Sequence, residues 1–380
     1  MRTVHPVARL LAIAIATALA FGLPASEAKA QVTISGVGYV QYGFALAKDT
    51  LTADSSIQHV NNFDITRAYI NVNGRLPGGI VTRVTADIFA PSVTGASNIP
   101  GSRVFRLKYA YVAWTPDSSH LTYKIGQMHT PFLDWEEAMW DYRMQGTVAM
   151  DRNGYMSSSD FGLGVDGKWN TDQLNFQAGI YNGENYNGGL SDQRKDFMAR
   201  ASYRLTNTND MTRVGGLRLT AYAQLGMPGS GGQRRRFIGM VSYRTADLTL
   251  AAEFAATKDS ITGGNTTVSG GAVGPLTARS GQVISAFGVY HVPATRVSFI
   301  GRVDLVDPNT ASATASDKQT RVIAGVSYQL TPNVRLMADY DGISYQSGFA
   351  PGTASLPNAN TSYAAYAARQ QLYFHTQFTF

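Results

Sequence analysis

The chain has no cysteine in its 380 residues, and charged residues make up only 15% of it. The missing cysteine excludes disulfides, cysteine-ligated metals and cysteine nucleophiles. Soluble domains usually carry about 25% charged residues, so the low charge argues against an ordinary soluble protein. After residue 30 no segment has the roughly 20 consecutive apolar residues that a transmembrane helix requires. The chain therefore fits neither a soluble domain nor a helical membrane protein.

Catalytic, metal-binding and nucleic-acid-binding patterns are also missing. Histidine and acidic residues do not occur at metal-ligand spacings, and there is no Gly-x-Ser-x-Gly nucleophile elbow. The longest basic run is Arg234-Arg235-Arg236, within a chain of net charge +6. We therefore expect no enzymatic activity, no cofactor, no bound metal and no nucleic-acid partner.

The polarity of the chain comes mainly from uncharged residues. It contains 38 Gly together with many Ser, Thr, Asn and Gln, and it has 20 Tyr and 17 Phe. A β-barrel in a bilayer needs this mixture, because its outer face is apolar, its inner face is polar, and aromatic residues gather at both interfaces.

The N-terminus has the pattern of a secretory signal peptide. Arg2 and Arg9 form a positive region, Leu10–Leu23 is an apolar stretch, and Ala28-Lys29-Ala30 is a small-residue cleavage site. We expect residues 1–30 to be removed, so that residues 31–380 form the mature protein.

Alternation of apolar and polar residues dominates the mature chain. In Leu217–Leu225, for example, every second residue is Leu or Ala, and the residues between them are Arg, Thr, Tyr and Gln. Such period-two patterns predict strands with one apolar face. Sixteen segments show the pattern, near 32–47, 60–75, 80–90, 103–115, 120–129, 159–170, 173–182, 194–205, 216–226, 234–245, 247–258, 280–292, 295–306, 319–331, 333–345 and 368–380.

Short and long connections alternate between these segments. Long connections fall at 48–59, 91–102, 130–158, 183–193, 259–279, 307–318 and 346–367, with a shorter one at 227–233. The connections between them are short, although 206–215 is less tight than the others. An all-β transmembrane antiparallel barrel of about 16 strands predicts this alternation, with short periplasmic turns and long external loops. Sheets in lipid must close, and this number of strands encloses a water-filled channel.

The third long connection, 130–158, is rich in Trp, Met and Tyr, which external loops rarely need. We expect it to fold inward and narrow the pore, although packing outside the barrel against a neighbouring subunit or lipid is the alternative. Its charged residues are then candidate constriction residues: Asp134, Glu136, Glu137, Asp141, Asp151, Arg143 and Arg152.

Basic residues predominate on the face predicted to line the lumen. The candidates for an anion path are Arg67, Arg83, Arg106, Lys108, Lys124, Arg200, Arg218 and Arg302. Acids on the same face are fewer and include Asp87, Asp166, Glu253, Asp304 and Asp339. A surplus of arginine predicts a positive lumen that concentrates anions. The alternative is that each arginine is paired with an acid and only shapes the pore.

Aromatic residues on or near the strand ends are expected to form the interface girdle. They include Tyr109, Tyr111, Trp114, Trp169, Tyr203, Tyr243, Tyr328 and Tyr340. The final strand ends in alternating aromatics and a terminal Phe380, which resembles the signal read by the outer-membrane assembly machinery.

Two segments resemble the phosphate-selective porin O/P family. They are Asn62–Gly74, which reads NFDITRAYINVNG, and Lys124–Phe132, which reads KIGQMHTPF. The resemblance implies a trimeric porin of 16 strands. Phosphate selectivity in that family is associated with stacked arginines and a lysine cluster, whereas segment 130–158 has no lysine.

These observations together predict a porin in the outer membrane of a Gram-negative bacterium. We expect passive diffusion of small hydrophilic solutes and ions with a preference for anions. The expected partners are small anions or polar solutes, outer-membrane lipid, the assembly machinery and two further copies of the chain. The alternative is a barrel without a transport role, such as an adhesin, a surface-binding protein or an outer-membrane hydrolase.

Overall fold

The computed structural model describes residues 31–50, 57–89, 103–186, 193–227, 232–262, 276–311, 317–346 and 368–380. The predicted signal peptide and the central parts of most predicted external loops lie outside the described residues. Segment 130–158, the predicted constriction loop, lies within them.

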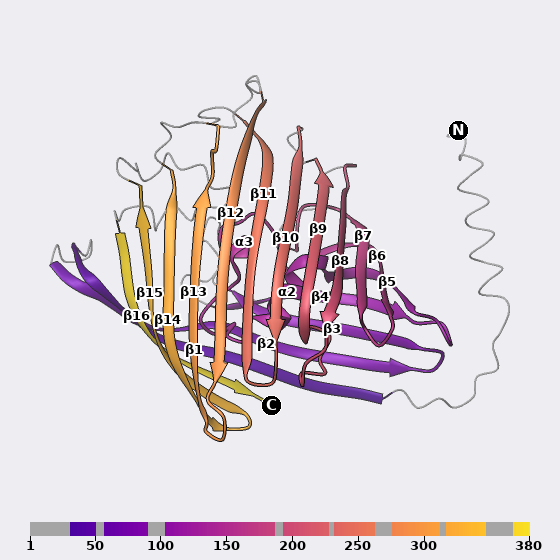
Figure 1. The fold of residues 1–380 in the computed structure, drawn as a ribbon, viewed down its shortest axis with the longest axis horizontal. Coiled ribbons are helices and arrows are strands. Elements are labelled where there is room, and N and C mark those ends of the chain that lie inside the picture. Colours follow the sequence, from indigo (N-terminus) through magenta and orange to yellow (C-terminus); the bar gives the residue numbers. More distant parts are fainter. Residues whose placement is uncertain are drawn as a thin grey trace.

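Sixteen antiparallel strands form one closed barrel (Figure 1). The strands are β1 Gln31–Thr50, β2 Ile57–Leu76, β3 Ile80–Phe89, β4 Val104–Trp114, β5 Leu121–His129, β6 Ser159–Trp169, β7 Leu174–Tyr181, β8 Asp196–Thr206, β9 Gly216–Gly226, β10 Arg234–Arg244, β11 Leu248–Thr262, β12 Leu276–His291, β13 Val297–Asp307, β14 Gln319–Thr331, β15 Val334–Tyr345 and β16 Ala368–Thr379. The predicted fold class is confirmed, and each predicted segment corresponds to one strand.

Closure depends on the pairing of the first strand with the last. β1 pairs with β16 from Val37 opposite Thr379 to Ala45 opposite Gln371. Beyond this ladder the backbone of Phe380 exchanges two hydrogen bonds with Gly36, of 2.9 and 3.1 Å. Every strand therefore has two neighbours, as a sheet surrounded by hydrocarbon requires.

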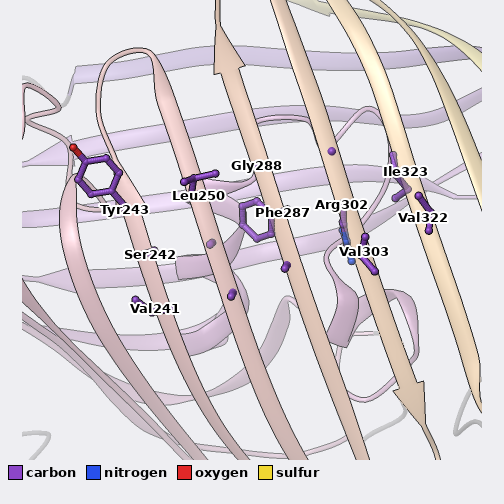
Figure 2. Close-up of a pocket in the computed structure, with 14 residues that line it drawn as sticks. Val241, Ser242, Tyr243, Leu250, Phe287, Gly288, Arg302, Val303, Val322 and Ile323 are labelled. Carbon is purple, nitrogen blue, oxygen red and sulfur yellow. The ribbon is translucent and has the colours of Figure 1, made fainter.

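The outer face of the wall is apolar along its whole circumference. Alternate side chains such as Leu219, Phe254 and Phe374 are exposed, whereas the residues between them are buried and mostly polar. A shallow apolar groove of about 530 Å³ crosses β10–β14 on this face, where Gly288 lies opposite Gly301 (Figure 2). The groove belongs to the lipid-facing surface and is not the channel.

Two short helices lie inside the barrel, between the near and far walls in Figure 1. They are α2 Pro131–Met139, which contacts β8, and α3 Ala149–Arg152, which contacts β12. No helix in the described ranges has the length and apolar content needed to cross a bilayer.

A β-bulge in β4 changes which side chains face the lumen. The register against β3 slips between Thr85 and Ala86, so Lys108 becomes an extra residue between Leu107 and Tyr109. Gln127 of β5 donates to the carbonyls of Leu107 and Lys108, at 2.7 and 2.8 Å. The amide of Gln127 thus satisfies the backbone that the bulge leaves without a ladder partner.

The bulge overturns part of the predicted aromatic girdle. Tyr109 is buried, and both Tyr109 and Tyr111 contact the ring of His129 on the inner side of the wall. Trp114 and Tyr328 are exposed on the outer face, as a girdle requires. The prediction for Tyr109 and Tyr111 was wrong because an uninterrupted alternation was assumed through β4.

Gly126 holds β5 close to β4 beside this bulge, and we expect Gly126→Ala to destabilise the barrel. Its φ is +122°, and an added Cβ would lie 2.3 Å from the carbonyl oxygen of Ala110. A strained backbone together with a steric clash should lower the free energy of unfolding by about 1–3 kcal/mol. Urea unfolding in detergent, followed by the loss of the compact gel band, measures this change.

Gly239→Ala is the matched control. Gly239 also lies within a strand, but a Cβ there would meet no atom within 4 Å. The control should unfold at the urea concentration that unfolds the wild-type protein. Equal stability of the two variants would contradict the role assigned to Gly126.

Candidate pore constriction

Segment 130–158, hereafter loop 3, lies against the inner wall and contacts strands far from it in sequence. The hydroxyl of Tyr142 hydrogen-bonds the hydroxyl of Ser327 at 2.7 Å. Gln145 donates to the carboxylates of Asp339 and Asp341, at 3.2 and 3.1 Å. The predicted inward position therefore corresponds to the geometry seen here, and the predicted alternative, packing outside the barrel, does not.

Arginines of the barrel bind the backbone carbonyls of loop 3. We call this set the arginine clamp. Its contacts are Arg200 to Pro131, Arg213 to Asp134, Arg244 to Ala138 and Met139, Arg335 to Asp141, Arg302 to Thr147, and Arg236 to Tyr155, at 2.7 to 3.3 Å. Hydrogen bonds from charged donors contribute about 1.5–3 kcal/mol each, so the clamp strongly favours the docked loop.

Three predicted anion-path residues are held by backbone carbonyls. Arg200, Arg218 and Arg302 are 2%, 0% and 2% exposed, respectively. Arg200 and Arg302 lie behind loop 3, and Arg218 joins two turns through the carbonyls of Gly215 and Asp172. For these three, the alternative that arginines only shape the pore agrees better with their contacts.

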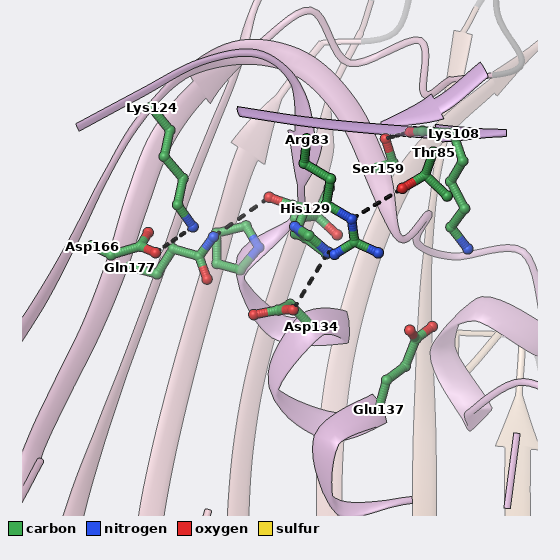
Figure 3. A network of polar contacts seen from close by, with 12 residues as sticks. Arg83, Thr85, Lys108, Lys124, His129, Asp134, Glu137, Ser159, Asp166 and Gln177 are labelled. Carbon is green, nitrogen blue, oxygen red and sulfur yellow. Dashed lines mark hydrogen bonds and ion pairs between the residues drawn. The ribbon is translucent and has the colours of Figure 1, made fainter. Parts of the chain in front are cut away.

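A cavity of about 310 Å³ remains between α2 and the wall formed by β1–β5. Its lining residues are Val37, Tyr39, Tyr69, Asn71, Arg83, Thr85, Lys108, Tyr109, His129, Asp134, Glu137, Ala138, Arg143 and Arg213. Figure 3 shows Arg83 and Lys108 on the wall side and Asp134 and Glu137 on the helix side. We call this cavity the constriction.

Arg83 and Lys108 have no carboxylate partner among the described residues. Arg83 donates to Thr85 and Asn71, and its other nitrogen lies 3.3 Å from the ring nitrogen of His129. The ammonium of Lys108 donates to the hydroxyl of Tyr69 at 2.8 Å. Neutral groups therefore orient both charges, and no carboxylate among the described residues pairs with either of them, although Lys108 is only 2% exposed.

The other predicted cations of this wall are paired. Arg67 and Arg106 both contact the buried carboxylate of Asp87, at 2.9 and 3.0 Å. Lys124 forms an ion pair with Asp166 (Figure 3). The carboxylate of Asp87 therefore offsets charge from both arginines.

The charged residues of loop 3 are divided between the constriction and the wall. Asp134 pairs with Arg213 and Glu137 with Arg143, at 2.7 and 2.6 Å. Burial opposes ionisation of Asp134, but His129 and Arg213 outweigh it and hold the pKa of this carboxyl well below its usual range. Asp134 is therefore ionised at ordinary pH, but Arg213 and Arg143 line the same cavity and offset the charges of Asp134 and Glu137.

The remaining loop residues serve as anchors. Asp141 pairs with Arg244 at 3.0 Å, and Arg152 lies 3.3 Å from Asp341. Glu136 was grouped with the constriction residues, but it is fully buried and does not line that cavity. Its side chain lies behind α2, because adjacent residues of a helix point about 100° apart.

Sequence reasoning missed several residues at the constriction. Tyr39, Tyr69 and Asn71 alternate correctly along their strands, so an inward position could have been read for them. Arg213 comes from the unusually long turn after β8, which reaches loop 3 from the periplasmic side. The length of that turn was the available signal. No group of three or more potential metal ligands occurs among the described residues.

Comparison with solved structures supports the fold. The chain is similar to an anion-selective porin from Comamonas acidovorans, with a TM-score of 0.62 and 11% identity over 93% of this chain and 100% of that one. Salmonella typhi OmpF, solved with daunomycin, gives a TM-score of 0.60 and 14% identity over 92% and 97%. In-vitro folded OmpT of Vibrio cholerae, in a trimer form, gives 0.57 and 11% over 92% and 99%.

No curated protein sequence matches the chain. The family model described as phosphate-selective porin O and P matches residues 38–289, which is more than half of the chain. This family and the closed barrel indicate an outer-membrane channel rather than an enzyme. The chain belongs to the phosphate-selective porin O and P family.

Proposed function

We propose that the protein is a passive diffusion channel for small anions and small polar solutes. The observation that carries the proposal is that Arg83 and Lys108 line the constriction and have no carboxylate partner among the described residues. Charges at a narrow point with low-dielectric walls act on every passing ion, whereas wider parts of the lumen are screened by salt. The anion-selective porin similar in fold to this chain is consistent with the same preference.

The proposal does not include specificity for phosphate. The constriction contains one lysine and no lysine from loop 3, and α2 places Asp134 and Glu137 across from it. These carboxylates oppose multiply charged anions more strongly than chloride, because Coulomb energy scales with the product of the charges. We infer a general preference for small monovalent anions, without a dedicated phosphate site.

Replacing both cations should reduce anion preference. In planar bilayers with a KCl gradient, we expect a chloride-selective reversal potential for the wild-type channel. The double variant Arg83→Ala/Lys108→Ala should shift that potential toward cation preference, with a several-fold change in permeability ratio. Phosphate added at low concentration should leave the chloride current of the wild-type channel nearly unchanged.

Arg296→Ala is the matched control for this change of charge. Arg296 is exposed at a turn, and within the described part of the chain its side chain donates only to the carbonyl of Leu330. Its removal should leave selectivity unaltered. Cation preference in the wild-type channel would refute the anion proposal. Strong competition between phosphate and chloride would favour a specific phosphate site. The lack of any steady channel would favour a non-transport barrel such as an adhesin.

We also propose that loop 3 sets the size limit, so loosening it should disturb conduction. Arg244 binds the carbonyls at the end of α2 and also pairs with Asp141 and Asp210, at 3.0 and 2.7 Å. Arg244→Ala should therefore increase current noise and the passage of larger sugars in a liposome-swelling assay. Arg244→Lys should restore part of the barrier, and unchanged uptake in the alanine variant would contradict the loop's role.

We also propose how the chains associate and which residue the assembly machinery recognises. We infer a homotrimer, supported by the trimer form of the fold neighbour from Vibrio cholerae. We also infer that Phe380, which is exposed to the lipid side, is read by the outer-membrane assembly machinery. For the trimer, light scattering in detergent should give the mass of three chains.

For the assembly signal, Phe380→Ala should slow folding in vivo without lowering the free energy of unfolding by more than about 1 kcal/mol.

A further inference from the structure

Two carboxylates are buried behind loop 3, and neither has a hydrogen-bond partner among the described residues. Glu136 on α2 is 0% exposed, and Glu253 on β11 is 3% exposed. All four of their carboxylate oxygens are buried and unpartnered. One belongs to the loop and the other to the wall, so together they lie across the surface on which the loop is docked.

Their surroundings offer little compensation for negative charge. In the strand register Glu253 lies opposite Ser285, which donates to Asp304 at 2.7 Å. Arg302, the nearest cation, is already paired with Asp304 at 2.8 Å. The second oxygen of Asp304 and one terminal nitrogen of Arg302 are likewise buried without partners.

The neighbouring charges that act most strongly on Glu136 belong to three acids and one base. Glu253 comes from β11, Asp304 and Arg302 come from β13, and Glu137 comes from the same helix. Glu253 itself faces Arg302 and Asp304 in addition to Glu136. A buried carboxylate without hydrogen bonds or a partner of its own is strongly destabilised when ionised. Burial, followed by the charge of Glu253, raises the pKa of Glu136 well above its usual range.

We propose that Glu136 and Glu253 form a proton-dependent latch, which holds loop 3 against the wall while they carry protons and releases it when both ionise. The inference rests on the proposed channel function only for its electrical readout. With the protons in place, the docked surface contains neutral acids beside Trp140 and Arg302, which stack at 5.6 Å. When the protons leave, two like charges lie close together in a buried interface.

The direction of the pH effect follows from proton linkage. The docked loop binds the proton on Glu136 more tightly than a detached, hydrated loop would. Docking is therefore strongest below the ordinary pKa of a glutamate, near about 4.3, and weakens as pH rises above it. For one proton, the equilibrium constant for docking of loop 3 falls by up to about tenfold per pH unit. This fall stops once the pH passes the raised pKa of Glu136 in the docked state. The latch thus opens toward alkaline pH.

Single-channel recording between about pH 6 and about pH 10 tests the latch over the titration range of a raised glutamate. The wild-type channel should show loop fluctuations that increase with pH. Glu136→Gln and Glu253→Gln each leave only one member of the pair able to ionise, so each should lose most of this increase. Asp117→Asn, in an exposed turn, removes a carboxylate elsewhere and should retain the wild-type pH profile.

A second measurement does not depend on conduction. The chain has 4 Trp, of which Trp135 and Trp140 on loop 3 are fully buried. In a Trp114→Phe/Trp169→Phe background, acrylamide quenching reports only on these two. Quenching should rise severalfold at alkaline pH, and Glu253→Gln should abolish the rise.

The two readouts distinguish failure of the latch from failure of the channel. If quenching changes with pH but no channel current is seen, the result would support the latch and refute the porin proposal. Quenching that stays constant to about pH 10, or that rises equally in the Glu253→Gln variant, would overturn the latch. Should a glutamine variant fail to fold, the wild-type quenching profile still decides between these outcomes.

Discussion

The constriction depends on how the backbone carbonyls of loop 3 are satisfied. A segment that leaves the sheet and crosses the lumen loses its ladder partners, and buried carbonyls without donors are costly. The arginine clamp supplies those donors from the opposite side of the barrel. A guanidinium suits this task because it remains charged at all relevant pH values and offers several donors in one plane. The arginine-rich wall is thus first a docking surface for the loop.

This use of arginine separates two groups of cations that look alike in the sequence. The clamp arginines on β8, β10, β13 and β15 bind carbonyls of the loop. The predicted anion-path cations on β2–β4 face the side of the lumen that the loop leaves open. Among these four, only Arg83 and Lys108 lack an acidic partner in the described residues. Counting inward basic residues therefore overstates the positive charge that a passing ion meets. What matters is which part of the wall the loop covers.

Much of the fold could be predicted because it is local. Period-two alternation and the spacing of turns located all sixteen strands, since a strand in lipid shows its apolar face in its own sequence. The inward and outward alternation of side chains is hard to read where a strand contains one extra residue. Thr66 is the extra residue of a bulge opposite Tyr39 and Val40, and the misassigned Tyr109 follows the bulge at Lys108. A bulge leaves little trace in composition, so it becomes visible only in the register.

The partners of loop 3 could not be predicted, because they are distant in sequence. Tyr142 meets Ser327, and the clamp joins residues of β8, β10, β13 and β15 to one short segment. Glu136 and Glu137 illustrate the limit at single-residue scale. They are adjacent and chemically alike, yet one lines the constriction and the other is buried behind the helix. Only the rotation of α2, which the clamp fixes, decides between them.

The same rotation determines the electrical character of the pore. It presents Asp134 and Glu137 to the constriction directly across from Arg83 and Lys108, so the helix that narrows the channel also offsets part of its positive potential. A narrow point with opposite charges on its two sides favours anions that follow the wall and leaves a path for small dipolar solutes between them. The selectivity of this barrel should therefore be moderate and local, set by a few side chains and not by the net charge of the lumen. Any motion of loop 3 that turns the carboxylates of α2 away would widen the pore and increase its anion preference together, because one rigid element controls both.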